Sequence, residues 1–169
     1  MAQLSKNFAD SEFHCSKHGK LHAPVHPKQI QLLQRIRDKV GKPLIVTSGS
    51  RCPEFQASLK AADLSDRVAA NSPHVPRMAD DGKMYSFATD IACFLGLDNK
   101  DPMVRQKMTR DLVRSVDPQC RIGWRAYAGH SFVHIDVAYL VSRDYIKGLT
   151  IPAASRQKLL SGWTRAVEW

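Results

Sequence analysis

One run of seven residues, 131–137, constrains this chain more than any other stretch. It reads Ser-Phe-Val-His-Ile-Asp-Val. Successive side chains of a strand point to opposite faces, so Phe132, His134 and Asp136 share one face and the branched aliphatic residues share the other. The pattern predicts a strand with an apolar back and a face that carries an imidazole and a carboxylate. Such a face suits a metal ligand beside a supporting acid, but ordinary half-buried strands have it too, so the rest of the chain must decide.

The surrounding pattern predicts a single α+β domain with a small antiparallel sheet flanked by helices. Residues 27–40 place apolar side chains at helical spacing, with Pro27 in the first turn and Gly41 after the end. Residues 43–47 and 87–94 are rich in apolar and branched side chains, as buried strands are. Residues 120–124 are joined to the strand at 131–137 by a short loop, which predicts an antiparallel hairpin.

Two further helices are expected in the second half of the chain. One begins after Asp101, which is a suitable N-cap. Its predicted inward stripe, in which methionine fills core space, is Val104, Met108, Leu112 and Val116. The last helix is expected over residues 153–167, with the aromatic side chains of Trp163 and Trp169 exposed.

Length and charge limit the classes of protein to consider. The chain has 169 residues, 43% of them hydrophobic, which fits one domain over residues 1–169 with an N-terminal arm at residues 1–26. No apolar run approaches the roughly 20 residues of a membrane helix, and no signal peptide is expected. The net charge of +9 favours polyanionic surroundings such as nucleic acid, acidic lipid or an anionic cell wall. No helix concentrates basic residues beside base-stacking aromatics, which disfavours a specific nucleic-acid binder.

Cysteines and histidines near the N-terminus invite a metal interpretation. Within thirteen residues the chain places His14, Cys15, His18, His22 and His26. Their spacing is not a standard ligand pattern and the segment is interrupted by glycine and proline, so we interpret it as a loop. The four cysteines form no C-x-x-C pair and are interpreted as buried thiols, with a disulfide left open: Cys15, Cys52, Cys93 and Cys120.

Two charged residues stand out beside the predicted strands. Asp90 lies inside the apolar strand at 87–94, where a carboxylate is costly unless it is paired or bound to a cation. A buried salt bridge and a metal ligand are equally open. Arg51 follows the strand at 43–47 in a turn, and it is either a surface arginine or part of a site at the rim of the sheet.

Together these segments resemble the zinc D-Ala-D-Ala carboxypeptidase and L-Ala-D-Glu endopeptidase family, whose fold is shared with the hedgehog signalling domain. Within that family the chain is most similar to small phage-encoded peptidoglycan peptidases. The resemblance covers most of the chain and is carried by residues 4–8, 12–15, 46–53, 72–74, 88–91 and 132–137.

The resemblance implies one zinc ion per chain, held by His74, Asp90 and His134. Two imidazoles and one carboxylate leave a fourth position for water, which is the arrangement of catalytic zinc. The S-x-H-x-x-G-x-A-x-D motif of the family places its aspartate seven positions after its histidine, whereas Asp90 comes sixteen positions after His74 here, and Ser86 stands in place of the glycine. An insertion at about 75–85 must therefore loop out, for which its Asp-Asp-Gly turn is suited.

The general base is left open by the sequence. Some relatives supply an acid three residues before the last histidine, where this chain has Ser131. His130 and Asp136 are both candidates, and Asp136 alternatively orients His134. Arg51 matches the arginine that steadies the substrate or the developing oxyanion. Substrate contacts are also expected from Ser72, Trp124 and Tyr127, although Trp124 suits core packing better.

The expected function is a zinc-dependent peptidase that hydrolyses the stem peptide of bacterial peptidoglycan, as a phage endolysin or a virion-associated lysin. The alternative, which Ser131 and the insertion favour, is a non-catalytic zinc-containing module that binds the cell wall or forms part of a virion. We expect peptidoglycan as the partner and a monomer unless the chain is part of a virion. The expected location is the host cytoplasm with release to the periplasm or cell wall, or the virion.

Overall fold

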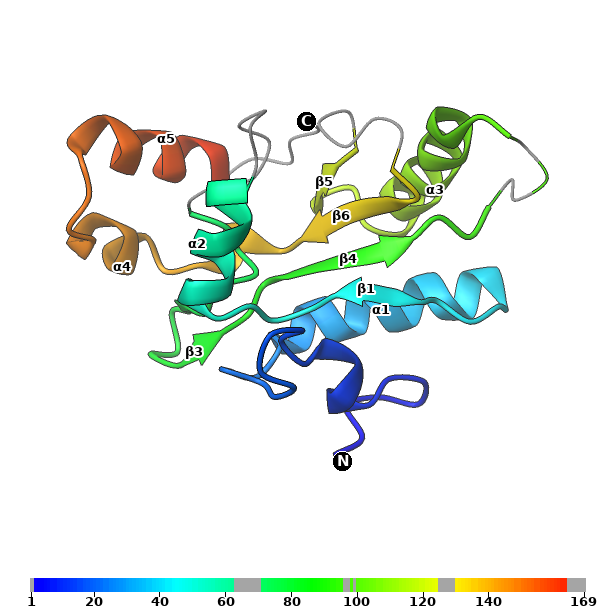
Figure 1. Ribbon diagram of the computed structural model, residues 1–169, viewed down its shortest axis with the longest axis horizontal. Coiled ribbons are helices and arrows are strands. Elements are labelled where there is room, and N and C mark those ends of the chain that lie inside the picture. The colour runs from blue at the N-terminus through cyan, green and yellow to red at the C-terminus, as the bar shows by residue number, and fades with distance from the viewer. Residues whose placement is uncertain (1, 63–70, 96–97, 99, 125–129, 164–169) are drawn as a thin grey trace.

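A four-stranded antiparallel sheet lies at the centre of the molecule (Figure 1). The computed structural model describes residues 2–62, 71–95, 98, 100–124 and 130–163. The strand order is β1-β4-β6-β5. The strands are β1 (Val46–Ser48), β4 (Ala88–Ala92), β5 (Arg121–Gly123) and β6 (Phe132–Asp136). The α+β class and the β5–β6 hairpin confirm the prediction, although all four strands are shorter than expected and β1 begins three residues later.

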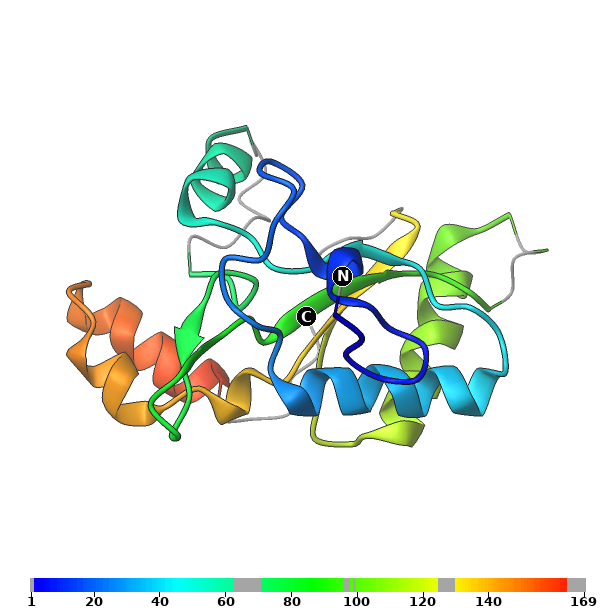
Figure 2. The same ribbon diagram turned by 90° about the horizontal axis from the view of Figure 1, so that it is seen from below.

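Two long helices, α1 (Pro27–Val40) and α3 (Pro102–Val116), lie on one side of the sheet, and α2 (Pro53–Ala62) lies on the other (Figure 2). The predicted bounds of α1 are confirmed. Gly41 ends α1 in the left-handed region, with φ 67°, and its amide donates to the carbonyl of Arg37. The face of the sheet away from α1 is therefore the one that α2 borders.

The predicted inward stripe of α3 is confirmed at Val116, which is buried, and at Leu112, which packs against the core, but it is wrong at Val104 and Met108, which are exposed to 37% and 42%. The helix also buries Gln106, Thr109 and Val113. Hydropathy predicts an exposed glutamine at position 106. Gln106 can be buried because its side-chain amide donates to the carbonyl of Phe132, at the start of β6, at 2.9 Å. The methionines of this helix do not fill the core. Asp101 is the N-cap as predicted, accepting from the amide of Met103.

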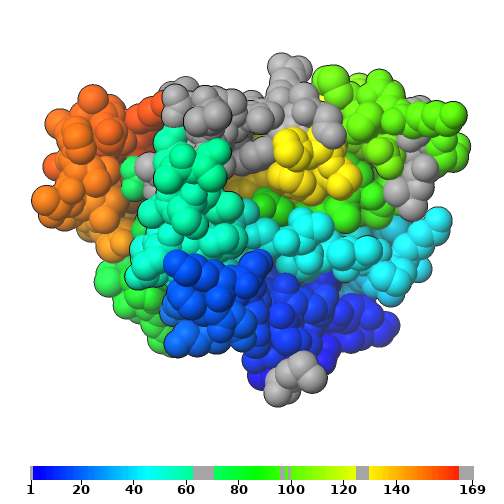
Figure 3. Space-filling view, viewed as in Figure 1, coloured from blue at the N-terminus to red at the C-terminus, as the bar shows by residue number. Residues whose placement is uncertain are grey.

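The N-terminal segment runs under β1 and α2 (Figure 3). It contains a single 3-10 turn, η1 (Asp10–Phe13), and both Phe8 and Phe13 are buried, with ring centroids 6.1 Å apart. The carbonyl of Phe13 accepts from the amide of Ser50. This segment is thus fixed to the chain that follows β1.

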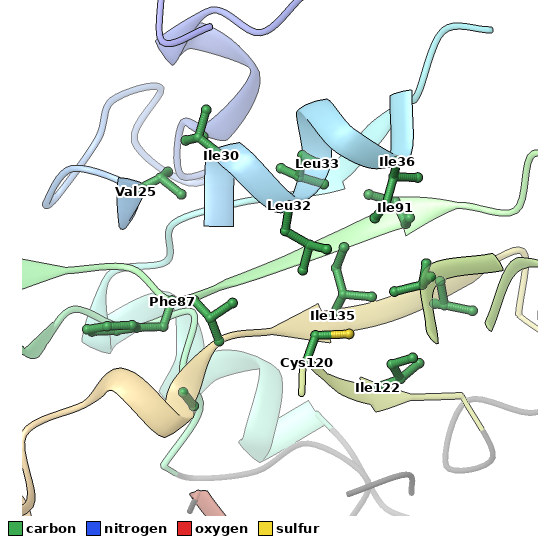
Figure 4. Packing of buried hydrophobic residues seen from close by; sticks show 14 of the residues in the cluster. Val25, Ile30, Leu32, Leu33, Ile36, Phe87, Ile91, Cys120, Ile122 and Ile135 are labelled. Carbon is green, nitrogen blue, oxygen red and sulfur yellow. The ribbon is translucent and has the colours of Figure 1, made fainter. Parts of the chain in front are cut away.

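The apolar core lies between α1 and the sheet. Figure 4 shows Leu32 pointing toward Ile135 of β6, and Ile36 beside Ile91 of β4. These strand residues alternate with the polar ones, so the apolar back predicted for β6 faces α1. All four cysteines are buried and free. None of the described helices is long and apolar enough to cross a membrane.

The remaining elements lie beyond one end of the central sheet (Figure 1). The segment expected to be an insertion forms an antiparallel pair, β2 (Arg77–Met78) and β3 (Met84–Tyr85), closed by a turn in which Gly82 has φ 77°. After β6 come η3 (Ala138–Leu140), α4 (Arg143–Gly148) and α5 (Ala153–Trp163). The predicted exposure of Trp163 is wrong, since its ring joins the main core. Trp169 and the expected end of this helix lie outside the described residues.

Candidate metal centre

The sheet register brings two predicted ligands side by side. Asp90 of β4 is paired with His134 of β6, and on either side of this pair lie Ser48 of β1 and Gly123 of β5. Directly paired residues of an antiparallel sheet project to the same face. The carboxylate and the imidazole therefore meet on the face opposite the apolar core.

His74, the third predicted ligand, reaches this face from a loop that is tied down on both sides. The hydroxyl of Ser72 accepts from the His74 amide, and the carbonyl of His74 accepts from the amide of Arg51. The hydroxyl of Ser86 also donates to the His74 carbonyl, and the amide of Phe87 donates to the carbonyl of Pro73. These bonds join the two ends of the β2–β3 hairpin, so the extra residues loop out without separating His74 from Asp90.

Three side-chain atoms converge at this point. Asp90 Oδ1 lies 2.8 Å from His134 Nδ1 and 3.1 Å from His74 Nε2, and the two ring nitrogens are 3.1 Å apart. All three residues are at most 5% exposed. The structure thus brings together the ligand set that the resemblance implied.

The other ring nitrogens fix the tautomers of both histidines. His74 Nδ1 lies 2.6 Å from the carbonyl of Gly49, which can only accept, so this nitrogen carries the proton. His134 Nε2 lies 3.0 Å from Asp136 Oδ2, a second acceptor. When both rings are neutral, each turns a lone pair toward Asp90. Three acceptors facing one another repel unless a cation lies between them.

The donor set fits zinc. Zinc binds imidazole nitrogen and carboxylate oxygen at about 2.0–2.2 Å, which places tetrahedral ligands about 3.3–3.6 Å apart. The three distances here, from 2.8 to 3.1 Å, would need to lengthen by roughly half an ångström around the ion. Three protein ligands rather than four are typical of a catalytic zinc ion.

Comparison with known proteins agrees with this chemistry. A family model described as Peptidase M15 matches residues 3–92, which is more than half of the chain. The chain belongs to the peptidase M15 family. M15 peptidases are zinc-dependent, which supports a zinc metallopeptidase. The match includes His74 and Asp90, whereas His134 follows it. No curated protein matches the chain, and no solved structure does.

Burial and charge keep two of the three candidate M15 ligands, His74 and Asp90, in the protonation states that metal binding needs, whereas at His134 a proton competes with the metal. Burial, together with the nearby Arg51 guanidinium, lowers the pKa of His74 to about 4. Burial opposes ionisation of Asp90, but the two imidazoles outweigh it and lower the pKa of this carboxyl. Burial would also lower the pKa of His134, but hydrogen bonds with Asp136 and Asp90 raise it. Near neutral pH, Asp90 is an anion and His74 a neutral donor.

Asp136 lies behind His134 rather than beside the three convergent atoms. It is fully buried, and Oδ2 contacts the His134 nitrogen that points away from Asp90. Oδ1 accepts from the amide of Ala138 and lies 3.6 Å from Arg121 Nε. Of the two roles open from the sequence, these contacts favour the orientation of His134 over proton transfer.

Arg51 touches the centre through Asp90. Its Nη2 nitrogen donates to Asp90 Oδ2 at 2.6 Å, which leaves Oδ1 for the convergent point. The Nε nitrogen donates to Ser48 Oγ and the Nη1 nitrogen to Gln56 Oε1. These bonds use three of the five N–H groups of a guanidinium. Within the part of the chain that the structure describes, the other two groups are left to donate to another anion.

The other predicted site residues are placed differently. His130 is exposed and its ring centroid is 5.4 Å from that of Phe132, the neighbour of His134 on the ligand face. Ser131 is exposed as well. Ser72 shapes the His74 loop, and Trp124 is buried in the core, where Arg110 lies over its ring. Tyr127 lies outside the described residues.

Gly49 is a functional position that the sequence reasoning missed. Its carbonyl orients His74, and a Cβ there would lie 2.5 Å from the backbone Cα of Phe13. Only glycine allows this approach of two backbones. A glycine just after a predicted strand, in the sequence Ser-Gly-Ser-Arg, could have indicated a close approach of two backbones. Gln56 was also missed, because nothing in its sequence context distinguishes a buried partner of Arg51 from a surface glutamine.

Proposed function

We propose that this M15 peptidase hydrolyses peptide bonds in the stem peptide of bacterial peptidoglycan. The observation that carries the proposal is the convergence of two imidazoles and one carboxylate, backed by hydrogen bonds from the far ring nitrogens to Gly49 and Asp136. The net charge of +9 suits an anionic cell wall. A role as a phage endolysin or a virion-associated lysin accords with the resemblance of the chain to small phage enzymes.

Each protein group has a defined task in this reaction. A zinc ion held by His74, Asp90 and His134 would supply a Lewis acid for the scissile carbonyl and a lowered pKa for the attacking water. Arg51 donates its two remaining N–H groups to the oxygen on which negative charge develops. Asp136 holds His134 in the ligating tautomer.

His130 is our candidate for the general base. A neutral imidazole can take a proton from water near neutral pH. Its ring packs against Phe132, which is one step along the ligand face from His134. Ser131, which stands where some relatives have an acid, cannot take this role because its hydroxyl is not basic. The imidazole would pass the proton to the leaving amine.

The proposal is tested on purified peptidoglycan by counting newly released amino groups and by mass spectrometry of the muropeptides. We expect shortened stem peptides, loss of activity with a zinc chelator, and recovery when zinc is added back. Free D-alanine would identify a carboxypeptidase, and a cut next to L-alanine an endopeptidase. His134→Ala should be inactive while it retains its circular dichroism spectrum.

Binding to peptidoglycan by zinc-loaded protein without any new amine would refute the peptidase and favour the non-catalytic cell-wall-binding or virion module. Full activity of His134→Ala would refute the metal centre. His14→Ala, a substitution of a histidine that belongs to neither cluster of candidate metal ligands, serves as the matched control for catalysis.

A further inference from the structure

Four metal-binding side chains gather in the N-terminal segment, apart from the M15 centre. They are Cys15, His18, His22 and Cys52, and one ligand atom from each lies within 4.8 Å of the others. The sequence interpretation as a plain loop rested on the spacing of the first three residues. The fourth, Cys52, comes from beyond α1, so no local pattern could include it.

The backbone holds these side chains in place. A tight turn joins Cys15 to Lys20: the Cys15 amide donates to the Lys20 carbonyl, and the Cys15 carbonyl accepts from the amides of His18 and Gly19. Gly19 adopts φ 62°, which a residue with a side chain rarely does. Figures 2 and 3 show this N-terminal segment against α2, whose first turn follows Cys52. The turn therefore presents Cys15 and His18 to Cys52.

The chemistry of the cluster favours a cation. Both sulfurs belong to buried free thiols, and the amide of Phe55 at the start of α2 lies 3.2 Å from Cys52 Sγ. Burial raises the pKa of the Cys52 thiol, so its thiolate needs a cation beside it. His18 Nδ1 lies 3.3 Å from His22 Nε2. Zinc bonds of about 2.0–2.3 Å to nitrogen and sulfur space tetrahedral ligands about 3.3–3.8 Å apart. The histidine pair already has this spacing, and no other pair of the ligand atoms exceeds it by more than about 1 Å.

We propose that Cys15, His18, His22 and Cys52 form a second, structural zinc site. Binding displaces the two thiol protons, and two thiolates neutralise the charge of the ion. Four protein ligands close the coordination sphere, so this ion has no place for water or substrate. The exposed histidines cover the side toward solvent, and the buried cysteines anchor the ion to the protein.

The site connects the arm to the M15 centre. Cys52 follows Arg51, whose guanidinium pairs with Asp90. The ion would fasten the turn at Cys15 to the residue after this arginine, and so restrict the loop from which Arg51 extends. The chain would then bind two zinc ions rather than the one that the sequence resemblance implied.

Metal analysis separates the two sites because only the new one contains sulfur. Protein purified under reducing conditions should contain two zinc ions per chain. Replacement by cobalt should give a thiolate-to-cobalt charge-transfer band, which the nitrogen and oxygen ligands of the M15 centre cannot produce. His134→Ala should keep this band and lose one ion, whereas the double variant His18→Ala/His22→Ala should lose the band and also one ion.

Folding does not obscure the result, because both substituted histidines are exposed. His14→Ala is the matched control from the same segment and should retain two ions and the band. One zinc ion in the wild-type protein without a thiolate band would overturn the proposal. A Cys15–Cys52 disulfide in the reduced preparation, detected by peptide mass spectrometry, would overturn it as well. Neither result would affect the proposed peptidase, whose ligands are different residues.

Discussion

Replacing Asp136 by asparagine should damage the M15 centre without removing a ligand. The carboxylate can only accept, so it keeps the proton of His134 on Nε2 and leaves Nδ1 free for metal. An asparagine can present its NH₂ group to Nε2 instead. The proton then moves to Nδ1, 2.8 Å from Asp90 Oδ1, where a metal ion would bind.

The expected loss is a 10–100-fold weaker affinity for zinc, about 1.4–2.7 kcal/mol, which is typical when the partner of a ligating histidine is changed. The affinity is measured by competition with a chromophoric chelator. The tautomer of His134 is determined in metal-free protein from the chemical shifts of its two ring nitrogens. In Asp136→Asn the proton should be on Nδ1, whereas in the wild type it is on Nε2.

Asp136→Asn also removes the negative charge next to Arg121, a buried side chain. Arg121→Gln is the matched control, since it disturbs the same contact but leaves the carboxylate on His134. It should lower the free energy of unfolding and leave zinc affinity near that of the wild type. If Asp136→Asn binds zinc within about twofold of the wild type, with the original tautomer, the orienting role assigned to Asp136 is wrong.

Four further changes have defined outcomes. Gly49→Ala should cost about 1–3 kcal/mol in urea unfolding, because the new Cβ meets the Phe13 backbone at 2.5 Å; a loss below about 0.5 kcal/mol would contradict the close approach. In chelator-treated protein, the pKa of His74 is lower in the folded than in the unfolded chain, so as the pH falls the unfolded chain is protonated at this residue before the folded chain. The free energy of unfolding should therefore be constant above pH 6.5 with respect to this group and fall by about 3 kcal/mol as the pH drops to about 4, a loss that His74→Gln should not show over the same range. Arg51→Lys should lower kcat about 10²–10³-fold with unchanged zinc content, since an ammonium cannot replace the three fixed bonds of the guanidinium; loss of zinc instead would assign Arg51 to metal retention. Asp101→Ala should lower the free energy of unfolding by about 0.5–2 kcal/mol, and no change would mean that the cap does not stabilise α3.

The sequence predicts those elements in which apolar spacing and the local ends agree. For α1, the stripe, the proline at the start and Gly41 at the end all indicate the same helix. For α3 they disagree. Its start was predictable from Asp101, but its buried face was not, because Gln106 is buried through a bond to a strand carbonyl more than twenty residues away. Hydropathy reports the cost of burying an amide and not the partner that offsets it.

The candidate ligands were predictable and the structure around them was not. His74, Asp90 and His134 follow from residue type and resemblance. The tautomers depend on the carbonyl of Gly49 and the carboxylate of Asp136, which are long-range contacts without a sequence pattern. The second cluster was missed for the same reason, since three of its residues are close in sequence and the fourth is remote.

Residues 48–52 connect these separate observations. Ser48 is in register with Asp90, the Gly49 carbonyl orients His74, and the Ser50 amide bonds to the arm at Phe13. The next two residues are Arg51, which pairs with Asp90, and Cys52, which lies in the second cluster. A change in any of the five residues moves its neighbours along the backbone, so the losses in free energy of unfolding from two substitutions within this segment should not add. The loss from one such substitution and the loss from Asp101→Ala should add within about 0.5 kcal/mol. Additivity inside the segment, measured by a double-mutant cycle of Gly49→Ala and Arg51→Lys on the free energy of unfolding, would show that it does not act as one unit.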